Sequence, residues 1–290
     1  MRCHPNRIKL SHPTCTQCGS AMAGLTNRQT QMEVTESNIS NGPKRAVGGI
    51  SQQANNIVSS QSSNWSGTSV VSTATPFKKE AIIGTFVVPT GHVPLGTCNG
   101  TTYHSSQWPG IDGNGSSDVL QAGTGVDASC SNGTTSTFYS AWVEWYPLNE
   151  ARVNSPVIHP GDLLMVEVWN TSPTAGYVYF YNQSTGESAQ YSLTAPNGTA
   201  LQGNSVEWIV ERPGVGGSLS QLTNYIDVSW PYGIAFNYES DTPVYHYMGR
   251  NPAVLTLEEI TMVDDNQNPI SYPVVENADF LWLQDTGSAY

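Results

Sequence analysis

The sequence predicts an all-β fold, a sandwich or a barrel, and two observations carry that prediction. First, apolar and aromatic residues recur in short runs separated by turn-forming glycine, proline, asparagine and aspartate. Second, only 12% of the residues are charged, against about 25% in ordinary domains, and glycine, serine, threonine, asparagine and tyrosine take their place. With 290 residues, the chain is long enough for one large all-β domain or two small ones.

The predicted strands are short apolar or alternating runs bounded by turn signals. In order they span residues 68–71, 80–89, 105–111, 119–122, 137–146, 163–170, 176–182, 188–193, 206–211, 226–230, 255–263 and 278–283. Only residues 252–259 also fit a helix. Residues 1–60 contain no strand-length apolar run and are rich in small polar residues. We therefore expect an irregular leader, prosegment or disordered tail over 1–60 and one β domain over 61–290.

The strand predicted at 206–211 is central to the functional prediction. Its even-numbered positions are Val206, Trp208 and Val210, and its odd-numbered positions are Glu207, Ile209 and Glu211. Because successive side chains alternate between the faces of a strand, the even positions suit a packed core. The odd positions place two carboxylates side by side on a sheet surface, either as a catalytic wall or as an acidic face turned to solvent.

Charge is divided unevenly between the two predicted regions. Residues 1–60 contain six Lys or Arg and two acids, a net charge of +4, whereas residues 61–290 contain five Lys or Arg and 21 acids, a net charge of −16. The acidic residues 61–290 exclude nucleic-acid binding, because the nucleic-acid backbone needs cations. They also suit an acidic environment: when the carboxylates are protonated, few positive charges remain to repel one another. The opposite signs predict an intramolecular contact of residues 1–60 with the acidic cleft. The sequence contains no run of about 18 apolar residues, so it predicts no membrane span.

The five cysteines fall into two groups. Cys98 and Cys130 lie in the β domain, where a disulfide is reasonable if the compartment is oxidising. The others lie in the first 20 residues and are Cys3, Cys15 and Cys18, near His4 and His12. A zinc knuckle and an oxidation-prone tail are the two interpretations of this cluster, and we assign no metal to the site.

Nucleophile and metal chemistry fit the sequence poorly. There is no Gly-x-Ser-x-Gly elbow, and the four histidines of residues 61–290 are scattered without metal-ligand spacing. Serine, cysteine and zinc hydrolases are therefore disfavoured, and a carboxylate mechanism is favoured.

Polar side chains occur among aromatic residues in three further segments. Trp142 and Glu144 share one face of a predicted strand, Gln121 lies in another, and Trp108 and Asp112 flank a glycine turn. A carboxylate beside aromatic rings is typical of a binding cleft, whereas a lone tryptophan is more often part of a core.

Six motifs occur in order, and together they resemble the glutamic peptidases, the eqolisin family. They are Asn64-Trp65-Ser66-Gly67, Trp108-x-Gly110-Ile111-Asp112-Gly113, Leu120-Gln121-Ala122-Gly123, Ala141-Trp142-Val143-Glu144-Trp145-Tyr146-Pro147, Gly161-Asp162 and Val206-Glu207-Trp208-Ile209-Val210-Glu211. The resemblance covers roughly residues 61–290. It implies a sandwich of two seven-stranded antiparallel sheets, a concanavalin-like jelly roll, and endopeptidase activity at acid pH without metal or cofactor.

The resemblance also assigns residues to roles. The catalytic pair is Gln121 and Glu211, and the positions that line or support the cleft are Trp108, Asp112, Gly113, Trp142 and Glu144. A glutamate near its ordinary pKa is partly ionised in acid, so it can take a proton from water and return it to the leaving nitrogen. A glutamine amide can donate to the oxygen that becomes negative, and it does not titrate. Arg212 stands where fungal members commonly have Asp, and a cation there should lower the pKa of Glu211 if the two are buried together.

The resemblance further implies polypeptide substrates, a monomer and an extracellular location, although residues 1–60 contain no clear signal peptide. Two alternatives stay open. A glycoside hydrolase would pair Glu144 with Glu207 or Glu211 and would not need Gln121. A lectin-like carbohydrate-binding sandwich would need the aromatic residues alone.

Overall fold

The computed structural model describes residues 34–54, 56–72, 79–237, 244–247, 249, 255–276 and 281–286. Every regular element in these ranges is a β-strand, which confirms the all-β prediction. No helix in the described ranges is long and apolar enough to cross a membrane. The predictions about the cysteines of the first 20 residues lie outside the described residues.

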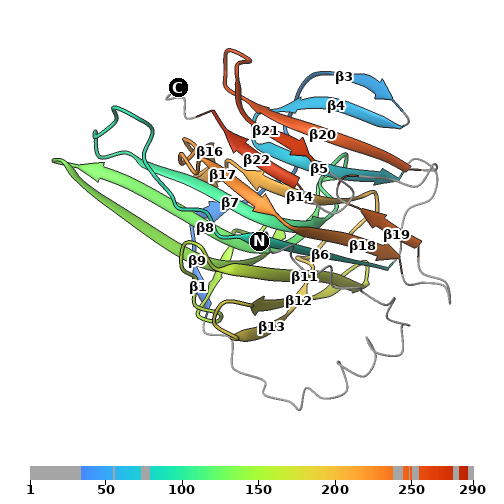
Figure 1. Cartoon of the computed structure of the whole chain (residues 1–290). Coiled ribbons are helices and arrows are strands. Elements are labelled where there is room, and N and C mark those ends of the chain that lie inside the picture. Colours follow the sequence, from blue (N-terminus) through green and yellow to red (C-terminus); the bar gives the residue numbers. More distant parts are fainter. Residues whose placement is uncertain are drawn as a thin grey trace, which may run out of the picture. The chain divides into compact units, whose positions relative to one another are not determined.

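The largest sheet has 13 strands, in the spatial order β1-β10-β9-β8-β7-β14-β5-β20-β21-β22-β17, with β4 pairing β20 and β3 pairing β4 (Figure 1). Its strands are β1 (Val34–Glu36), β3 (Ala46–Ala54), β4 (Ile57–Ser62), β5 (Trp65–Ser72), β7 (Thr102–Ile111), β8 (Val119–Ser131), β9 (Thr134–Tyr146), β10 (Ala151–Val153), β14 (Ser205–Glu211), β17 (Asp227–Trp230), β20 (Leu255–Val263), β21 (Pro269–Val275) and β22 (Leu281–Asp285). Among the described strands, every ladder of this sheet is antiparallel except β4–β20, which is parallel.

The second sheet has six strands in the order β13-β12-β11-β6-β18-β19. They are β6 (Glu80–Val87), β11 (Leu163–Ser172), β12 (Ala175–Asn182), β13 (Ser188–Thr194), β18 (Tyr232–Asn237) and β19 (Val244–Tyr247). A small third sheet joins β2 (Ile39–Ser40), β15 (Gly214–Val215) and β16 (Ser218–Leu219). The predicted pair of seven-stranded sheets is therefore wrong in its strand numbers, because strands from both ends of the chain extend one sheet to 13.

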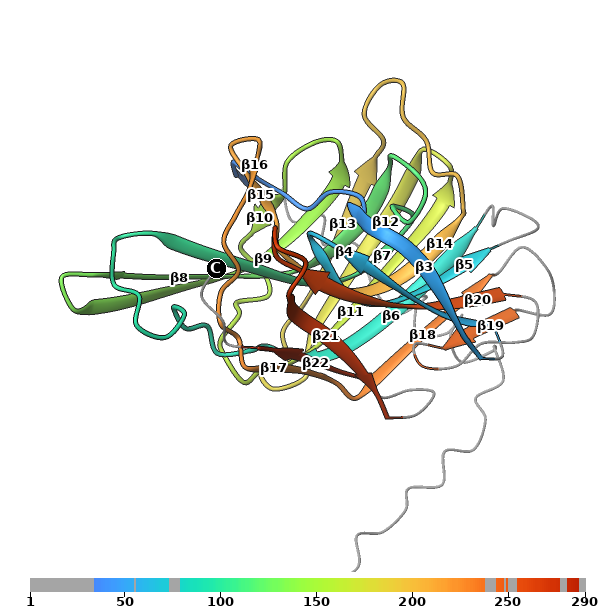
Figure 2. The same cartoon turned by 90° about the horizontal axis from the view of Figure 1, so that it is seen from above.

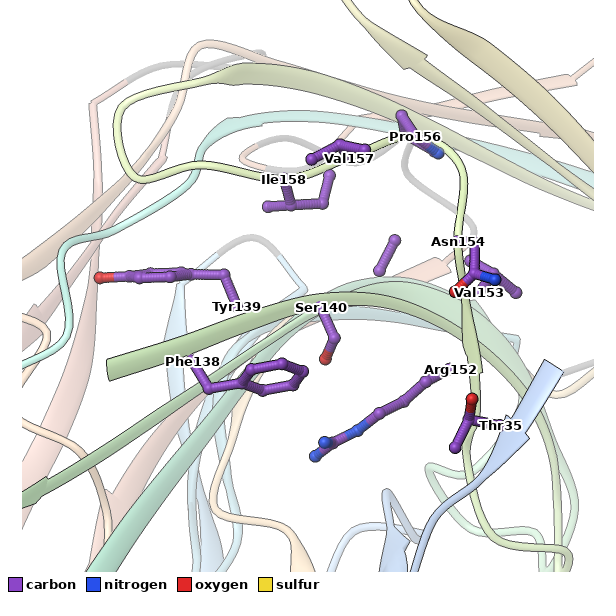
Figure 3. Close-up of a pocket in the computed structure, with 11 residues that line it drawn as sticks. Thr35, Phe138, Tyr139, Ser140, Arg152, Val153, Asn154, Pro156, Val157 and Ile158 are labelled. Atoms are coloured by element: carbon purple, nitrogen blue, oxygen red, sulfur yellow. The ribbon is translucent and has the colours of Figure 1, made fainter. Parts of the chain in front are cut away.

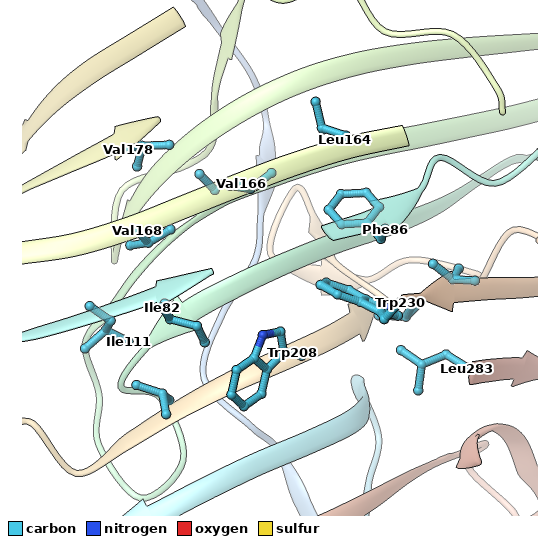
Figure 4. Close-up of a cluster of buried hydrophobic side chains, with 14 of the residues drawn as sticks. Ile82, Phe86, Ile111, Leu164, Val166, Val168, Val178, Trp208, Trp230 and Leu283 are labelled. Carbon is cyan, nitrogen blue, oxygen red and sulfur yellow. The ribbon is translucent and has the colours of Figure 1, made fainter. Parts of the chain in front are cut away.

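The two large sheets pack face to face across one apolar core (Figure 4). Alternate residues of β11, Leu164, Val166 and Val168, point into this core, and Trp208 of β14 meets them from the other sheet. The Trp208 indole Nε1 also donates a hydrogen bond to the carbonyl oxygen of Ile83, 2.9 Å away. The layers are thus joined by apolar burial and by a satisfied polar group.

Alternation along β14 is confirmed on its core side and corrected on the other. Val206, Trp208 and Val210 all belong to the core between the sheets. The opposite face was expected to be a sheet surface, but Glu207 and Glu211 are 0% and 1% exposed. Residues near the start of the described chain cover this second face.

Residues 34–62 are part of the fold, which corrects the expected irregular segment over 1–60 for this range. β1 pairs with β10, β2 pairs with β15, and β4 pairs with β20. Figure 2 shows β3 and β4 running beside β20 and β5. These ladders use backbone hydrogen bonds, so a segment with few apolar side chains can still join a sheet.

Of three other predictions, one is corrected and two are confirmed. The predicted strand at 119–122 is the start of β8, which continues to Ser131 and forms a long hairpin with β9. The strand predicted at 255–263 is confirmed as β20, so the helical alternative for residues 255–259 is excluded. The proposed disulfide is present: Cys130 of β8 bonds to Cys98 in the loop before β7.

Candidate active site

Glu211 is a buried carboxyl group that three hydrogen-bond donors surround. It ends β14, between β7 and β5. Its Oε1 accepts hydrogen bonds from the Gly42 backbone N–H at 3.0 Å and from Asn64 Nδ2 at 3.1 Å. Its Oε2 accepts from Trp108 Nε1 at 3.0 Å. These three donors orient the carboxyl group in a buried site.

Burial raises the pKa of Glu211 well above its ordinary value, and the hydrogen bonds from Asn64, Gly42 and Trp108 offset that rise only in part. Arg212 is not among the main causes of this shift, so the lowering of the Glu211 pKa by Arg212 stays a prediction. Arg212 follows Glu211 directly, and its cation contributes to a lowered pKa at Asp264, where hydrogen bonds from Asn268 are the larger cause.

Gln121 reaches the same place from β8, which β7 separates from β14. It is 0% exposed, and its Nε2 donates to the backbone carbonyl oxygen of Asn41. Gln121 Oε1 has no hydrogen-bond partner among the described residues. The amide nitrogen of Gln121 is thus hydrogen-bonded, whereas its amide oxygen is buried without a hydrogen-bond partner among the described residues.

Gln121 and Glu211 therefore hold the two ends of a single peptide bond. The carbonyl oxygen of Asn41 receives the Gln121 amide proton, and the N–H of Gly42, the next residue, donates to Glu211. An amide donor thus lies at the carbonyl oxygen of this bond, and a carboxyl group lies at its nitrogen.

Glu144 holds the residue before that bond. It lies opposite Gln121 in the β8–β9 ladder, and its two oxygens accept from the Asn41 backbone N–H at 3.2 and 3.0 Å. The Asn41 side-chain Nδ2 lies 3.2 Å from Glu144 Oε2 and 3.2 Å from Glu150 Oε2. Burial raises the pKa of Glu144 well above its ordinary value, and the charges of Glu150 and Glu211 add to the rise.

A buried ion pair holds the residues that follow the bond. Lys44 Nζ lies 2.6 Å from Glu258 Oε1 of β20, and the two side chains are 7% and 3% exposed. Burial alone would raise the pKa of Glu258, but the Lys44 ammonium and the hydrogen bonds lower it overall. The Lys44 backbone N–H donates to the carbonyl oxygen of Gly113 at 3.1 Å. Residues 39–45, which we call the covering segment, are thus anchored on both sides of the Asn41–Gly42 bond.

Trp108 and Trp142 form the floor of this face rather than an exposed platform. Both are 0% exposed and cluster with Trp65 and Ile209. Trp65 meets Trp108 edge to face, with ring centroids 5.1 Å apart. A Cβ at Gly123 would come within 1.9 Å of a backbone oxygen and 2.8 Å of the Trp108 Cβ, so the tryptophan floor needs glycine on β8.

Asp112 and Gly113 lie outside the contacts around Glu211. The Asp112 carboxylate accepts backbone hydrogen bonds from residues 202–204 at 2.6, 2.9 and 2.6 Å. Gly113 has a φ of +107° and donates its N–H to Ser116 Oγ. In the described chain these two residues shape a turn and a loop, and only the Gly113 carbonyl touches the covering segment.

A cavity of about 300 Å³ lies beyond Arg152 (Figure 3). Arg152 lines it beside Phe138, and its Nε donates to Glu150 Oε1 at 3.0 Å. Glu150 also accepts from Asn41, so hydrogen bonds through Glu150 connect a residue that lines this cavity to Asn41. Among the described residues, no group of three or more His, Cys, Asp or Glu side chains could hold a metal ion.

Sequence reasoning missed Asn41, Gly42, Glu150 and the role of Asn64. Asn64 stands in a quoted motif, so its contact with Glu211 could have been anticipated. Asn41 and Gly42 carried only a turn signal, and nothing in a local pattern says which distant site a turn will cover.

A family model described as the Peptidase A4 family matches residues 63–244. Aspergillopepsin-2 from Aspergillus niger is 35% identical over 129 residues, which are 44% of this chain and 44% of that protein. Scytalidopepsin B from Scytalidium lignicola is 28% identical over 189 residues, which are 65% of this chain and 64% of that protein. The chain thus spans less than two thirds of the length of either curated relative.

Solved structures agree in fold. Scytalido-glutamic peptidase with a transition state analog inhibitor superposes with a TM-score of 0.60 at 20% identity, over 77% of this chain and 98% of that chain. SCP-B, a member of the eqolisin family in complex with the tripeptide Ala-Ile-His, has a TM-score of 0.55 at 19% identity, over 77% and 98%. Since the family model covers more than half of its residues, this chain belongs to the Peptidase A4 family, the glutamic peptidases.

Proposed function

We propose that the protein is an acid endopeptidase in which Glu211 is the general base and Gln121 stabilises the tetrahedral intermediate. Glu211 takes a proton from a water molecule as that water attacks the carbonyl carbon. Gln121 Nε2 donates to the oxygen that becomes negative. Glu211 then gives the proton to the leaving nitrogen.

One observation carries this proposal: Gln121 and Glu211, from strands that are not neighbours, contact the oxygen and the nitrogen of one peptide bond. Membership of the glutamic peptidases supports it. The proposed role of Trp108 is to orient the Glu211 carboxylate, and that of Glu144 is to bind the substrate residue before the cut bond.

The state of the covering segment affects the base. With the segment in place, burial raises the pKa of Glu211 well above its ordinary value. Departure of residues 39–42 would admit water and remove much of that desolvation, so the pKa would fall and more of the base would be ionised in mild acid. The exposed site would then suit unfolded polypeptides.

The carbohydrate alternatives are not favoured. The family match is to peptidases. We also propose that the protein acts as a monomer outside the cell, where the disulfide between Cys98 and Cys130 would persist.

The test is hydrolysis of acid-denatured protein and of polysaccharides between about pH 2 and pH 5. We expect peptide products from the protein, no sugar products, and no inhibition by pepstatin-type, serine-directed, cysteine-directed or chelating reagents. Loss of proteolysis with any one of these inhibitors, or release of sugars, would contradict the proposal.

A further inference from the structure

We infer that the Asn41–Gly42 bond is the bond that this protein cuts in itself, so that the covering segment is an intramolecular substrate. This inference rests on the proposed function, because the same carboxyl and amide groups do the chemistry. It adds the identity of the bond and the end of the part that is released.

The contacts at this bond differ from those of a segment that merely blocks a site. The Asn41 carbonyl oxygen is bound by Gln121, and the Gly42 nitrogen lies 3.0 Å from Glu211 Oε1. A blocking segment could satisfy these groups with any polar atoms. Here the atoms are the oxygen and the nitrogen of one amide, each next to the group that the reaction assigns to it.

The chain is fixed on both sides of the bond. Before it, Ile39 and Ser40 pair with β15 as a strand, and Asn41 is held by Glu144 and Glu150. After it, the Gly42 carbonyl oxygen accepts from Trp65 Nε1 at 3.0 Å. Tethering replaces the encounter of two molecules, so the entropy cost of bringing bond and base together is already met by folding.

The step balances with water as the only co-reactant. The water oxygen forms a bond to the Asn41 carbonyl carbon, and the π-electron pair moves to the oxygen that Gln121 binds. The water proton passes to Glu211 in its ionised form, which is the minor form in acid while the segment is in place, because burial raises the pKa of Glu211. When that pair returns, the carbon–nitrogen bond breaks and the Gly42 nitrogen takes the proton from Glu211. The products are a carboxyl group on Asn41 and an amino group on Gly42.

The position of the bond explains which part can leave. Residues up to Asn41 attach through the short strands β1 and β2, of three and two residues. Residues after Gly42 continue into β3 and β4, which pair within the large sheet. The released part would therefore end at residue 41, not at the boundary near residue 60 that composition alone predicts.

The sequence provides matched internal controls. The dipeptide Asn-Gly occurs at four other places. Asn114 is buried in one of them, Asn114–Gly115, whereas both residues are exposed at Asn99–Gly100, Asn132–Gly133 and Asn197–Gly198, which serve as the controls. Spontaneous breakdown at Asn-Gly, or a preference for the dipeptide alone, would act at these bonds at least as fast. Placement in the site predicts cutting at Asn41–Gly42 only.

The experiment incubates the full chain at about pH 4 and follows intact mass and new N-terminal sequences over time. We expect one early product that begins at Gly42, formed with a first-order rate that stays constant over a tenfold range of protein concentration. Glu211→Gln and Gln121→Ala should each slow this cut by on the order of a hundredfold or more. Glu207→Gln, on the same strand and face, should still be cut.

Four results would overturn the inference: a first cut elsewhere, equal cutting at the exposed Asn-Gly bonds, a cut that persists in Glu211→Gln, and a rate that rises with protein concentration. An added unfolded protein, digested in the same tubes, separates this inference from the proposed function. If the added protein is digested while Asn41–Gly42 stays intact, only the inference fails. If neither is cut, both fail.

Discussion

The indole Nε1 of Trp108 lies 3.0 Å from Oε2 of Glu211 and donates a hydrogen bond to it. A hydrogen bond to the ionised form of a carboxyl group favours that form, so Trp108 lowers the pKa of Glu211 against the larger effect of burial. Trp108 thus connects the tryptophan floor of the site to the proposed base.

Trp108→Phe should shift the acidic limb of the kcat/KM profile to higher pH, because the pKa of Glu211 rises when this donor is removed. The measurement is kcat/KM on an unfolded polypeptide from about pH 2 to pH 7. Trp142→Phe is the control, since Trp142 Nε1 has no hydrogen-bond partner among the described residues. If the limb stays in place with Trp108→Phe, or moves equally with both variants, Trp108 does not act through Glu211.

Folding stability should be greater in acid than at neutral pH. Burial raises the pKa values of Glu144, Glu207 and Glu211 well above their ordinary values. The folded state therefore binds protons at these three carboxyl groups more tightly than the unfolded chain does. The resulting contribution to folding stability is fully present below the unfolded pKa near 4.5 and is lost as pH rises through the pKa values of the folded state. We expect Tm to fall by roughly a few degrees or more between pH 4 and pH 8.

This comparison is best made in the Gln121→Ala background, where no self-cleavage is expected at pH 4. Adding Glu207→Gln should make Tm depend less on pH, because one of the buried carboxyl groups is gone. Asp265→Asn, at an exposed position, should leave the dependence as it was. A Tm that rises from pH 4 to pH 8 would show that the buried carboxyl groups do not dominate.

Gly123→Ala should disrupt the fold. The added Cβ would lie 1.9 Å from the Gln107 carbonyl oxygen, so β7 and β8 would have to separate. Overpacking of this kind costs about 1–3 kcal/mol or more. Gly125→Ala, two residues along β8, is the matched control, since its Cβ would meet its nearest neighbour, Ser140 Oγ, at 3.1 Å. Urea unfolding of both variants measures the difference, and equal losses would contradict the argument.

Lys44→Met should loosen the covering segment at neutral pH. Removing the ammonium leaves Glu258 as a buried carboxylate without its ion-pair partner, which costs about 3–5 kcal/mol. Arg45→Met is the control, because Arg45 is exposed. Limited proteolysis at pH 7 should cut residues 39–45 faster in the first variant only. Because the pair is buried, salt should change wild-type cutting little, and equal cutting of both variants would exclude this anchor.

β14 illustrates what the sequence could and could not predict. A period of two correctly assigns Val206, Trp208 and Val210 to the core, because alternation is a local property of a strand. The same period says nothing about what covers Glu207 and Glu211, since that depends on pairing with residues some 170 positions earlier. The buried state of these carboxyl groups therefore had to come from the structure.

β8 and the covering segment show a second limit. Gly123 and Gly125 lower strand propensity, so composition ends the predicted strand at 122. At Gly123, however, close packing against Gln107 and Trp108 requires glycine. Residues 39–42 lack an apolar pattern and attach through backbone groups and buried polar contacts. Propensity and periodicity do not report either kind of contact.

The central claim, that Glu211 is the base, is tested most directly by comparing Glu211→Gln with Glu207→Gln. Both residues lie on the same face of β14 and are buried. Both substitutions replace a carboxyl group with an amide of nearly the same size. The measurement is kcat/KM on an unfolded polypeptide at acid pH, with the far-ultraviolet spectrum of each variant as a check on folding. We predict a loss on the order of a hundredfold or more for Glu211→Gln and retained activity for Glu207→Gln. Retained activity in Glu211→Gln, with its loss in Glu207→Gln, would contradict the assignment.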